Sequence, residues 1–291
     1  MINKIKNIII KKNLDGYIVP KNDKYFTEYS KISNLELVTN FSGSAGFAII
    51  LRNKNYLFVD GRYTIQAKKQ SGRKFKIYEI PLIWPKNIFK SYKNKLNIGF
   101  DPKLFTYNSL NNYFSNTCTL TAINENLFYK KNKKGLKINK FYNLDNKIAG
   151  ESSKSKINRV VKILNKKKID YLFVSSGENI CWLMNIRGKD LPNSPVANCN
   201  IILTKNRKIY FFSKSSKISK IKNKLINQKV FFYEEEKLFE ILRSIKPGSF
   251  CIDKQTCSIF NEEIIKSNFL VKHRTDFIYY LKSIKNKTEI K

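Results

Sequence analysis

LDGYIV (Leu14–Val19) and IDYLFV (Ile169–Val174) are one strand pattern that occurs twice in a single chain. Each follows a segment whose apolar residues recur at helical spacing, which predicts a helix leading into a buried strand. The helical positions are Ile2, Ile5, Ile8 and Ile9 in the first copy and Ile157, Val160, Val161, Ile163 and Leu164 in the second. The repetition predicts that one helix-and-strand unit is present in duplicate.

Two further landmarks repeat in the same order. AIIL and NYLFVD, separated by polar residues 52–54, predict a β-hairpin, and NIILT and KIYFF predict its counterpart around residues 205–207. NIGFD, which ends at Asp101, then matches SFCID, which ends at Asp253. The offset between the copies stays between 152 and 155 residues, so we infer a duplicated domain.

Helical patterns alternate with short apolar strands in both copies. This alternation predicts an α/β fold of two tandem related domains, each a mixed, mostly parallel sheet flanked by helices, with the hairpin as an antiparallel pair at one edge. We expect a first domain over residues 1–128, a lysine-, asparagine- and glycine-rich linker over 129–153, and a second domain over 154–274. A helix over 275–291 has no terminal glycine or proline and is expected to lead into a further domain.

The composition fits two domains in a reducing compartment. The chain has 291 residues, 42% of them hydrophobic, and a formal net charge of +34. Its lysines are spread over all predicted elements rather than gathered on one face, which argues against a nucleic-acid partner. RNA binding through the high positive charge stays an alternative. No apolar stretch approaches the roughly 20 residues that span a bilayer, and no signal peptide is recognisable. The prediction is a cytoplasmic protein without a membrane partner.

Catalytic and metal-ligating residues are scarce. The five cysteines are an odd number in apolar surroundings, which indicates buried thiols rather than disulfides or a zinc site. The single histidine, His273, lies between lysine and arginine and is interpreted as a solvated surface residue. With no second histidine, no nucleophile elbow and no convergent acidic cluster, we assign no catalytic residue and no metal ligand within the chain.

Two glycine-containing motifs mark the first copy. FSGSAG, residues 41–46, is followed by a strand rather than by the helix that phosphate binding requires, so a tight turn is favoured over a phosphate site. In VDGRY, Asp60 ends a strand and Arg62 begins a helix beyond the edge of the sheet. Arg62 could pair locally with Asp60 or could bind a ligand, because strand ends of α/β sheets often hold ligands. Only eight of the 56 basic residues are arginine, so each is a candidate for a position that needs a planar guanidinium.

The second copy carries ENICWLMNIRGKDLPNSPV, residues 178–196. Its apolar helical face, with Trp182 at the centre, is predicted to be core. Arg187 and Asp190 bracket a glycine and are expected to form a structural ion pair. Pro192 and Pro195 stiffen an exposed loop of a kind that lines a cleft or a subunit contact.

These motifs together resemble a known family. DGYIVPKNDKYFTEY, NFSGSAGFAII and FVDGRYTIQAKKQ resemble the first domain of cytosolic-type Xaa-Pro aminopeptidases, and NICWLMNIRGKDLPNSPV and LKSIKNKTEI look like the second domain and the segment leading to the third. The resemblance implies creatinase-type N-terminal domains. It also implies release of the first residue from peptides with proline second, by two metal ions, usually manganese, in a C-terminal domain that has no counterpart here.

The resemblance assigns one site residue, because the arginine of the DGRY motif falls on Arg62 and implies contact with the peptide substrate. It further implies a homodimer and a role in substrate gating, with no catalytic activity of this chain alone. The alternative is a stand-alone interaction module of the same fold without peptidase activity. The coding region after Lys291 would distinguish the two.

Overall fold

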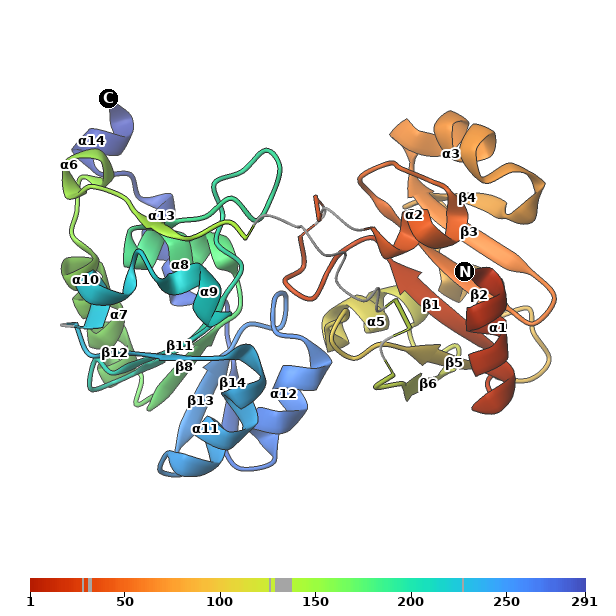
Figure 1. The fold of residues 1–291 in the computed structure, drawn as a ribbon. Coiled ribbons are helices and arrows are strands. Elements are labelled where there is room, and N and C mark those ends of the chain that lie inside the picture. The colour runs from red at the N-terminus through yellow and green to blue at the C-terminus, as the bar shows by residue number, and fades with distance from the viewer. Residues whose placement is uncertain (28, 31–32, 126, 129–137, 227) are drawn as a thin grey trace. The chain divides into compact units, whose positions relative to one another are not determined.

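The computed structural model describes residues 1–27, 29–30, 33–125, 127–128, 138–226 and 228–291. The chain divides into two compact units, Met1–Lys133 and Lys134–Lys291, each built on a six-stranded sheet (Figure 1). Each unit is mixed α/β, as the alternation of elements predicts.

The first unit contains α1 (Ile2–Lys11), β1 (Gly16–Pro20), α2 (Asn34–Thr39), β2 (Gly46–Leu51), β3 (Asn55–Asp60), η1 (Gly61–Tyr63), α3 (Thr64–Ser71), η2 (Gly72–Lys74), β4 (Lys76–Ile80), α4 (Pro85–Phe89), β5 (Asn97–Phe100), α5 (Tyr107–Phe114) and β6 (Thr119–Ala122). The second contains β7 (Tyr142–Asn143), α6 (Asn146–Ala149), α7 (Ser153–Lys166), β8 (Tyr171–Val174), α8 (Gly177–Met184), β9 (Ile186–Arg187), β10 (Asn200–Thr204), β11 (Ile209–Phe212), α9 (Ser215–Ile218), α10 (Lys222–Ile226), β12 (Val230–Tyr233), η3 (Glu235–Lys237), α11 (Leu238–Ser244), β13 (Ser249–Ile252), α12 (Ile259–Lys266), β14 (Leu270–His273), α13 (Phe277–Ser283) and α14 (Lys287–Ile290).

The two large sheets have the same topology. Their strand orders are β4-β3-β2-β1-β5-β6 and β12-β11-β10-β8-β13-β14. In each sheet one strand, β2 or β10, runs antiparallel to both neighbours, and all other pairs are parallel. The duplication inferred from the sequence is therefore a duplication of the whole sheet.

The hairpin does not lie at the edge of the sheet, contrary to the expectation from its sequence. In the first unit β4 pairs in parallel with β3, so β3 and its hairpin partner β2 are interior strands. After the hairpin, the chain crosses over through α3, and β4 then joins the sheet beside β3. Periodicity within the hairpin does not predict where this later strand pairs.

Alternate residues of each interior strand enter opposite cores, as the period of two requires. In β2, Ala48 and Ile50 pack under α1, whereas the ring of Phe47 stacks on Phe58 and on Tyr113 of α5 at centroid distances of 4.9 and 4.3 Å. In the second unit the two faces of β10 and β11 likewise enter separate clusters, one with α7 and α8 and one with α11 and α12. Helices thus cover both faces of each sheet.

Helix α7 shows how local sequence sets these boundaries. The Ser152 hydroxyl accepts a hydrogen bond from the Ser155 amide and caps the helix, and the predicted apolar face then packs on α8. Leu164 on that face has no exposed surface, so its truncation to alanine would cost about 2–5 kcal/mol.

The described part of the predicted linker, residues 138–153, belongs to the second unit instead. Phe141 has no exposed surface and lies in the core with α7 and α8, and β7 pairs with β9. Phe141 is surrounded in sequence by lysines and asparagines, so the composition of the segment did not predict that this residue is buried. Residues 129–137 of the same prediction lie outside the described residues.

The C-terminal segment is two helices rather than one. The Asp276 carboxylate caps α13, and α13 ends at Ser283 because Ile284 adopts an extended conformation. Asn286 then caps α14 through a reciprocal pair of hydrogen bonds with Glu289. The continuous helix expected over 275–291 is therefore wrong.

Candidate functional site

The carboxyl ends of the parallel strands in the first unit collect polar side chains. Asp60 ends β3, and Asp101 directly follows β5. In α/β sheets ligands bind preferentially at this edge. Burial raises the pKa of Asp101, whose carboxylate also accepts a hydrogen bond from the Lys103 amide.

Arg62 is held at this edge by Asp60. The Asp60 carboxylate accepts hydrogen bonds from the Arg62 amide at 3.0 Å and from its Nε at 2.7 Å, with Nη2 at 3.4 Å. The nearby guanidinium lowers the pKa of Asp60, so the pair is charged at neutral pH. The local ion pair considered for these residues is therefore present, yet the Arg62 side chain is 72% exposed. A guanidinium has five N–H donors, so several remain for a ligand.

Tyr63 joins Arg62 to the glycine-containing motif. The Arg62 guanidinium carbon lies 5.4 Å from the centre of the Tyr63 ring, and that ring packs edge-on against Phe41. The Tyr63 hydroxyl bonds to the Ser44 hydroxyl at 2.9 Å. FSGSAG and DGRY thus form one surface around the arginine.

The glycines of FSGSAG serve backbone geometry. Gly46 has a φ of +148°, and a Cβ there would lie 2.5 Å from the Phe58 carbonyl oxygen. Strand β2 begins at Gly46, so no helix N-terminus follows this loop. The positive φ predicted for a glycine of this motif is present at Gly46, and the arrangement lacks the helix that a phosphate-binding loop uses.

The motif of residues 178–196 is partly as predicted. Trp182, Leu183 and Ile186 are all buried in the core. The expected pairing of Arg187 with Asp190 is wrong, because Asp190 bonds to Lys217 of α9 at 2.7 Å. Arg187 donates through Nη1 to the carbonyls of Cys181 and Ile186, at 3.0 and 2.8 Å. The prediction chose the cation nearest to Asp190 in sequence, whereas the fold places Lys217, 27 residues away, beside it.

A pocket of about 280 Å³ opens beside this motif. It is lined by Glu178, Cys181, Trp182, Arg187, Pro195, Val196, Lys282, Lys285 and Glu289. The prolines were predicted to stiffen a loop that lines a cleft, and Pro195 lines this one, whereas Pro192 does not.

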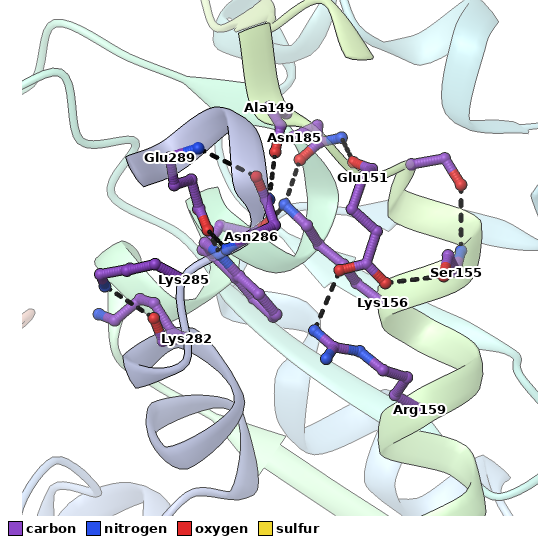
Figure 2. Close-up of polar contacts among 12 residues, drawn as sticks. Ala149, Glu151, Ser155, Lys156, Arg159, Asn185, Lys282, Lys285, Asn286 and Glu289 are labelled. Carbon is purple, nitrogen blue, oxygen red and sulfur yellow. Dashed lines mark hydrogen bonds and ion pairs between the residues drawn. The ribbon is translucent and has the colours of Figure 1, made fainter. Parts of the chain in front are cut away.

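A polar network behind the pocket was not predicted (Figure 2). Lys156 of α7 is 1% exposed, and its Nζ donates to the Trp182 carbonyl at 3.0 Å and to Asn185 Oδ1 at 2.8 Å. The same nitrogen lies 4.4 Å from the centre of the Trp182 ring. Arg159 of the same helix donates a hydrogen bond to the Glu151 carboxylate at 3.0 Å (Figure 2). The available signal was the position of Lys156 on the apolar face of its helix, next to Ile157.

His273 is exposed, as predicted, but it has a partner that was not predicted. Its Nε2 lies 2.8 Å from Oε1 of Glu262, a carboxylate whose side chain is 3% exposed and which also binds Lys266. The sequence did not indicate this partner, which α12 supplies. The five cysteines are free and buried, as predicted, and burial raises the pKa of each thiol.

Within the described ranges, no three His, Cys, Asp or Glu side chains gather as a metal site would require. No helix in the same part of the chain is long and apolar enough to cross a membrane. The geometry around Arg62 can bind a carbonyl or carboxylate by hydrogen bonds and charge.

Comparisons with known proteins cover both units. Two models described as creatinase/prolidase N-terminal domain match residues 1–127 and 132–289. A probable Xaa-Pro aminopeptidase P from Laccaria bicolor is 26% identical over 99% of this chain and 47% of its own length. Xaa-Pro aminopeptidase 1 of Dictyostelium discoideum is 28% identical over 99% of this chain and 49% of its own length.

A solved structure shares the fold. The X-prolyl aminopeptidase of Caenorhabditis elegans, described as a cytosolic enzyme with a di-nuclear active site, superposes with a TM-score of 0.86 and 21% identity. The match covers 99% of this chain and 52% of that one. The chain thus spans about half the length of the relatives it matches.

Proposed function

The chain belongs to the creatinase/prolidase N-terminal domain family over both of its units, and on this basis we propose that it forms the two non-catalytic N-terminal domains of a Xaa-Pro aminopeptidase. The relatives that carry this name are about twice as long as the chain. In this proposal the di-nuclear metal centre, with manganese as the expected metal, is held by residues outside these 291. A cytoplasmic location is part of the proposal, supported by the nematode relative, which is described as a cytosolic enzyme.

We infer that Arg62 is the residue of this chain that contacts the peptide. The observation that carries the inference is a guanidinium held by Asp60 at the carboxyl edge of the sheet and yet 72% exposed. Bonding through Nε leaves Nη1 for a peptide carbonyl or carboxylate, and the Tyr63 ring supports one face of the guanidinium. Substrate gating and homodimerisation are the wider roles that we propose for these domains.

The test titrates the 291-residue chain with Ala-Pro-Ala and follows the backbone amide resonance of Tyr63 by NMR, a group that wild type and the Arg62 variants share. Arg62→Gln is expected to weaken binding about tenfold or more, and Arg62→Lys to weaken it less, because charge remains but the fork is lost. Arg243→Gln is the matched control, since Arg243 lies on another unit over the Phe239 ring. Equal affinities of wild type and Arg62→Gln would contradict the assigned role.

The non-catalytic part of the proposal has its own assay. The chain with added manganese and Ala-Pro-Ala is expected to release no alanine. Robust turnover that survives purification would overturn it. Sedimentation of the same sample tests homodimerisation, for which a monomer at all concentrations is the contrary result.

A further inference from the structure

The pocket beside Trp182 has the composition of a binding site for a small ligand. Its volume of about 280 Å³ lies near the lower end of the range for small-molecule pockets. Trp182, Pro195 and Val196 supply apolar surface, and Arg187, Lys282 and Lys285 supply positive charge. Residues from α8, β9, α13 and α14 thus converge on one cavity within the second unit.

The aromatic wall is fixed from two sides. The Trp182 indole N–H donates to Glu289 Oε1 at 3.2 Å, and Lys156 lies over the ring. Asn286 of the same segment donates through its side chain to the Ala149 carbonyl at 2.9 Å, which anchors the segment to α6 (Figure 2). A wall held in this way costs little further ordering when a ligand binds.

Arg187 is oriented but incompletely bonded. Two backbone carbonyls accept hydrogen bonds from its Nη1, which fixes the plane of the guanidinium. Within the described residues neither Nε nor Nη2 has a hydrogen-bond or ion-pair partner. These two groups form the edge of the guanidinium that matches a carboxylate in a bidentate pair.

The acidic residues of the pocket leave that edge available. Both Glu289 oxygens are engaged, Oε1 by Trp182 and Oε2 by the Asn286 amide. Glu178 is 71% exposed and lies 3.9 Å from Lys282 Nζ at the rim. An ammonium group of a ligand could approach Glu178, while its carboxylate approaches Arg187.

We propose that this pocket binds a small carboxylate with an apolar body, the class that includes free amino acids and the C-terminal residues of short peptides. The carboxylate bonds to Arg187, and the apolar body packs against Trp182 and Pro195. The site lies in the second unit and does not use Arg62, so it stands or falls independently of the function proposed above.

The test uses Trp182 as its own reporter. The chain has two tryptophans, so Trp84→Phe leaves one indole N–H resonance in a nitrogen-15 spectrum. Ala-Leu is added as the probe and is not a Xaa-Pro peptide. A saturable shift is expected, about tenfold or more weaker with Ala-Leu amide and with Arg187→Gln, and unchanged with Arg243→Gln.

The source of the ligand is distinguished by N-acetyl-Ala-Leu. Binding as tight as that of Ala-Leu indicates a peptide C-terminus, whereas loss of binding indicates a free amino acid or dipeptide whose ammonium meets Glu178. No saturable shift with either compound, or equal binding of acid and amide, overturns the proposal. The comparison of Ala-Leu with Ala-Leu amide uses protein that retains Arg187. It therefore tests the proposal even if the Arg187→Gln variant does not fold.

Discussion

The indole N–H of Trp182 on α8 donates a hydrogen bond to the Glu289 carboxylate on α14, at 3.2 Å and across 107 residues of chain. The same carboxylate accepts a hydrogen bond from the Asn286 amide, so one side chain helps to cap α14 and also holds it against α8. A helix of four residues would not persist in water without such contacts.

Glu289→Ala is therefore expected to release α14. The loss of a hydrogen bond to a charged acceptor should cost roughly 1.5–3 kcal/mol locally. Hydrogen exchange at the amides of residues 289–291 should accelerate about tenfold, with little change in global unfolding. Glu289→Gln keeps the acceptor oxygen and serves as the control; if Glu289→Ala leaves exchange unchanged, the clamp does not hold the helix.

Lys156 predicts an alkaline dependence of stability. Burial lowers its pKa to about 8, against the raising effects of Glu289 and Glu151 and with the lowering effects of Arg187 and Arg159. Between about pH 8 and the ordinary lysine pKa of 10.5, the unfolded chain keeps the proton that the folded chain releases, so the free energy of unfolding rises with pH in this interval. A neutral amine can still donate both hydrogen bonds.

The measurement for Lys156 compares urea midpoints of wild type and Lys156→Met at about pH 7, 8, 9 and 10. The advantage of wild type should grow with pH over this interval, because the other lysines titrate equally in both proteins. A constant difference, or one that shrinks with rising pH, would contradict the lowered pKa.

Asp276 predicts the opposite slope at acid pH. Burial raises its pKa to about 6, although Asn179 and the Ile278 amide donate to its carboxylate. Between about pH 4 and 6 the folded chain binds more protons than the unfolded one, so this group makes stability fall as pH rises. Asp276→Asn should remove this group's contribution to the pH dependence of stability in that interval and should keep the helix cap.

The Asp276→Asn variant has a specific means of accommodation. Asn179 Oδ1 is buried without a hydrogen-bond partner in the described structure, so a flip of that amide supplies an acceptor for the new donor. Asp276→Ala also removes the cap and should be about 1 kcal/mol less stable than Asp276→Asn at every pH, because neither variant titrates at this position. Thermal melts from about pH 4 to 7 check both, and an unaltered slope for Asp276→Asn would refute the account.

Gly46→Ala is expected to destabilise the first unit by more than about 2 kcal/mol. It combines a φ of +148° with a close approach to the Phe58 carbonyl of the neighbouring strand. Gly61→Ala is the control, because its added Cβ meets only the flexible Glu79 side chain. Chemical denaturation of both variants measures the difference, and equal stabilities would remove the argument.

Patterns within the amino-acid sequence were enough to predict the duplication, the positions of the strands and the buried faces of helices such as α7, because these follow from periodicity over short stretches of chain. The family resemblance also identified Arg62 as the residue to examine. The structure shows the ion pair with Asp60, which lies two residues away and within reach of local reasoning.

Only the three-dimensional structure showed which charged residues pair with each other and which segments enter the cores. Asp190 received Lys217 rather than Arg187, Phe141 entered the core of the second unit, and Glu289 reached Trp182. Each contact joins residues that are far apart in sequence, and in a chain with 48 lysines many cations could have served equally well. Which lysine pairs with a given carboxylate depends on where the backbone places distant segments. The pattern of side chains along a single helix or strand does not contain that information.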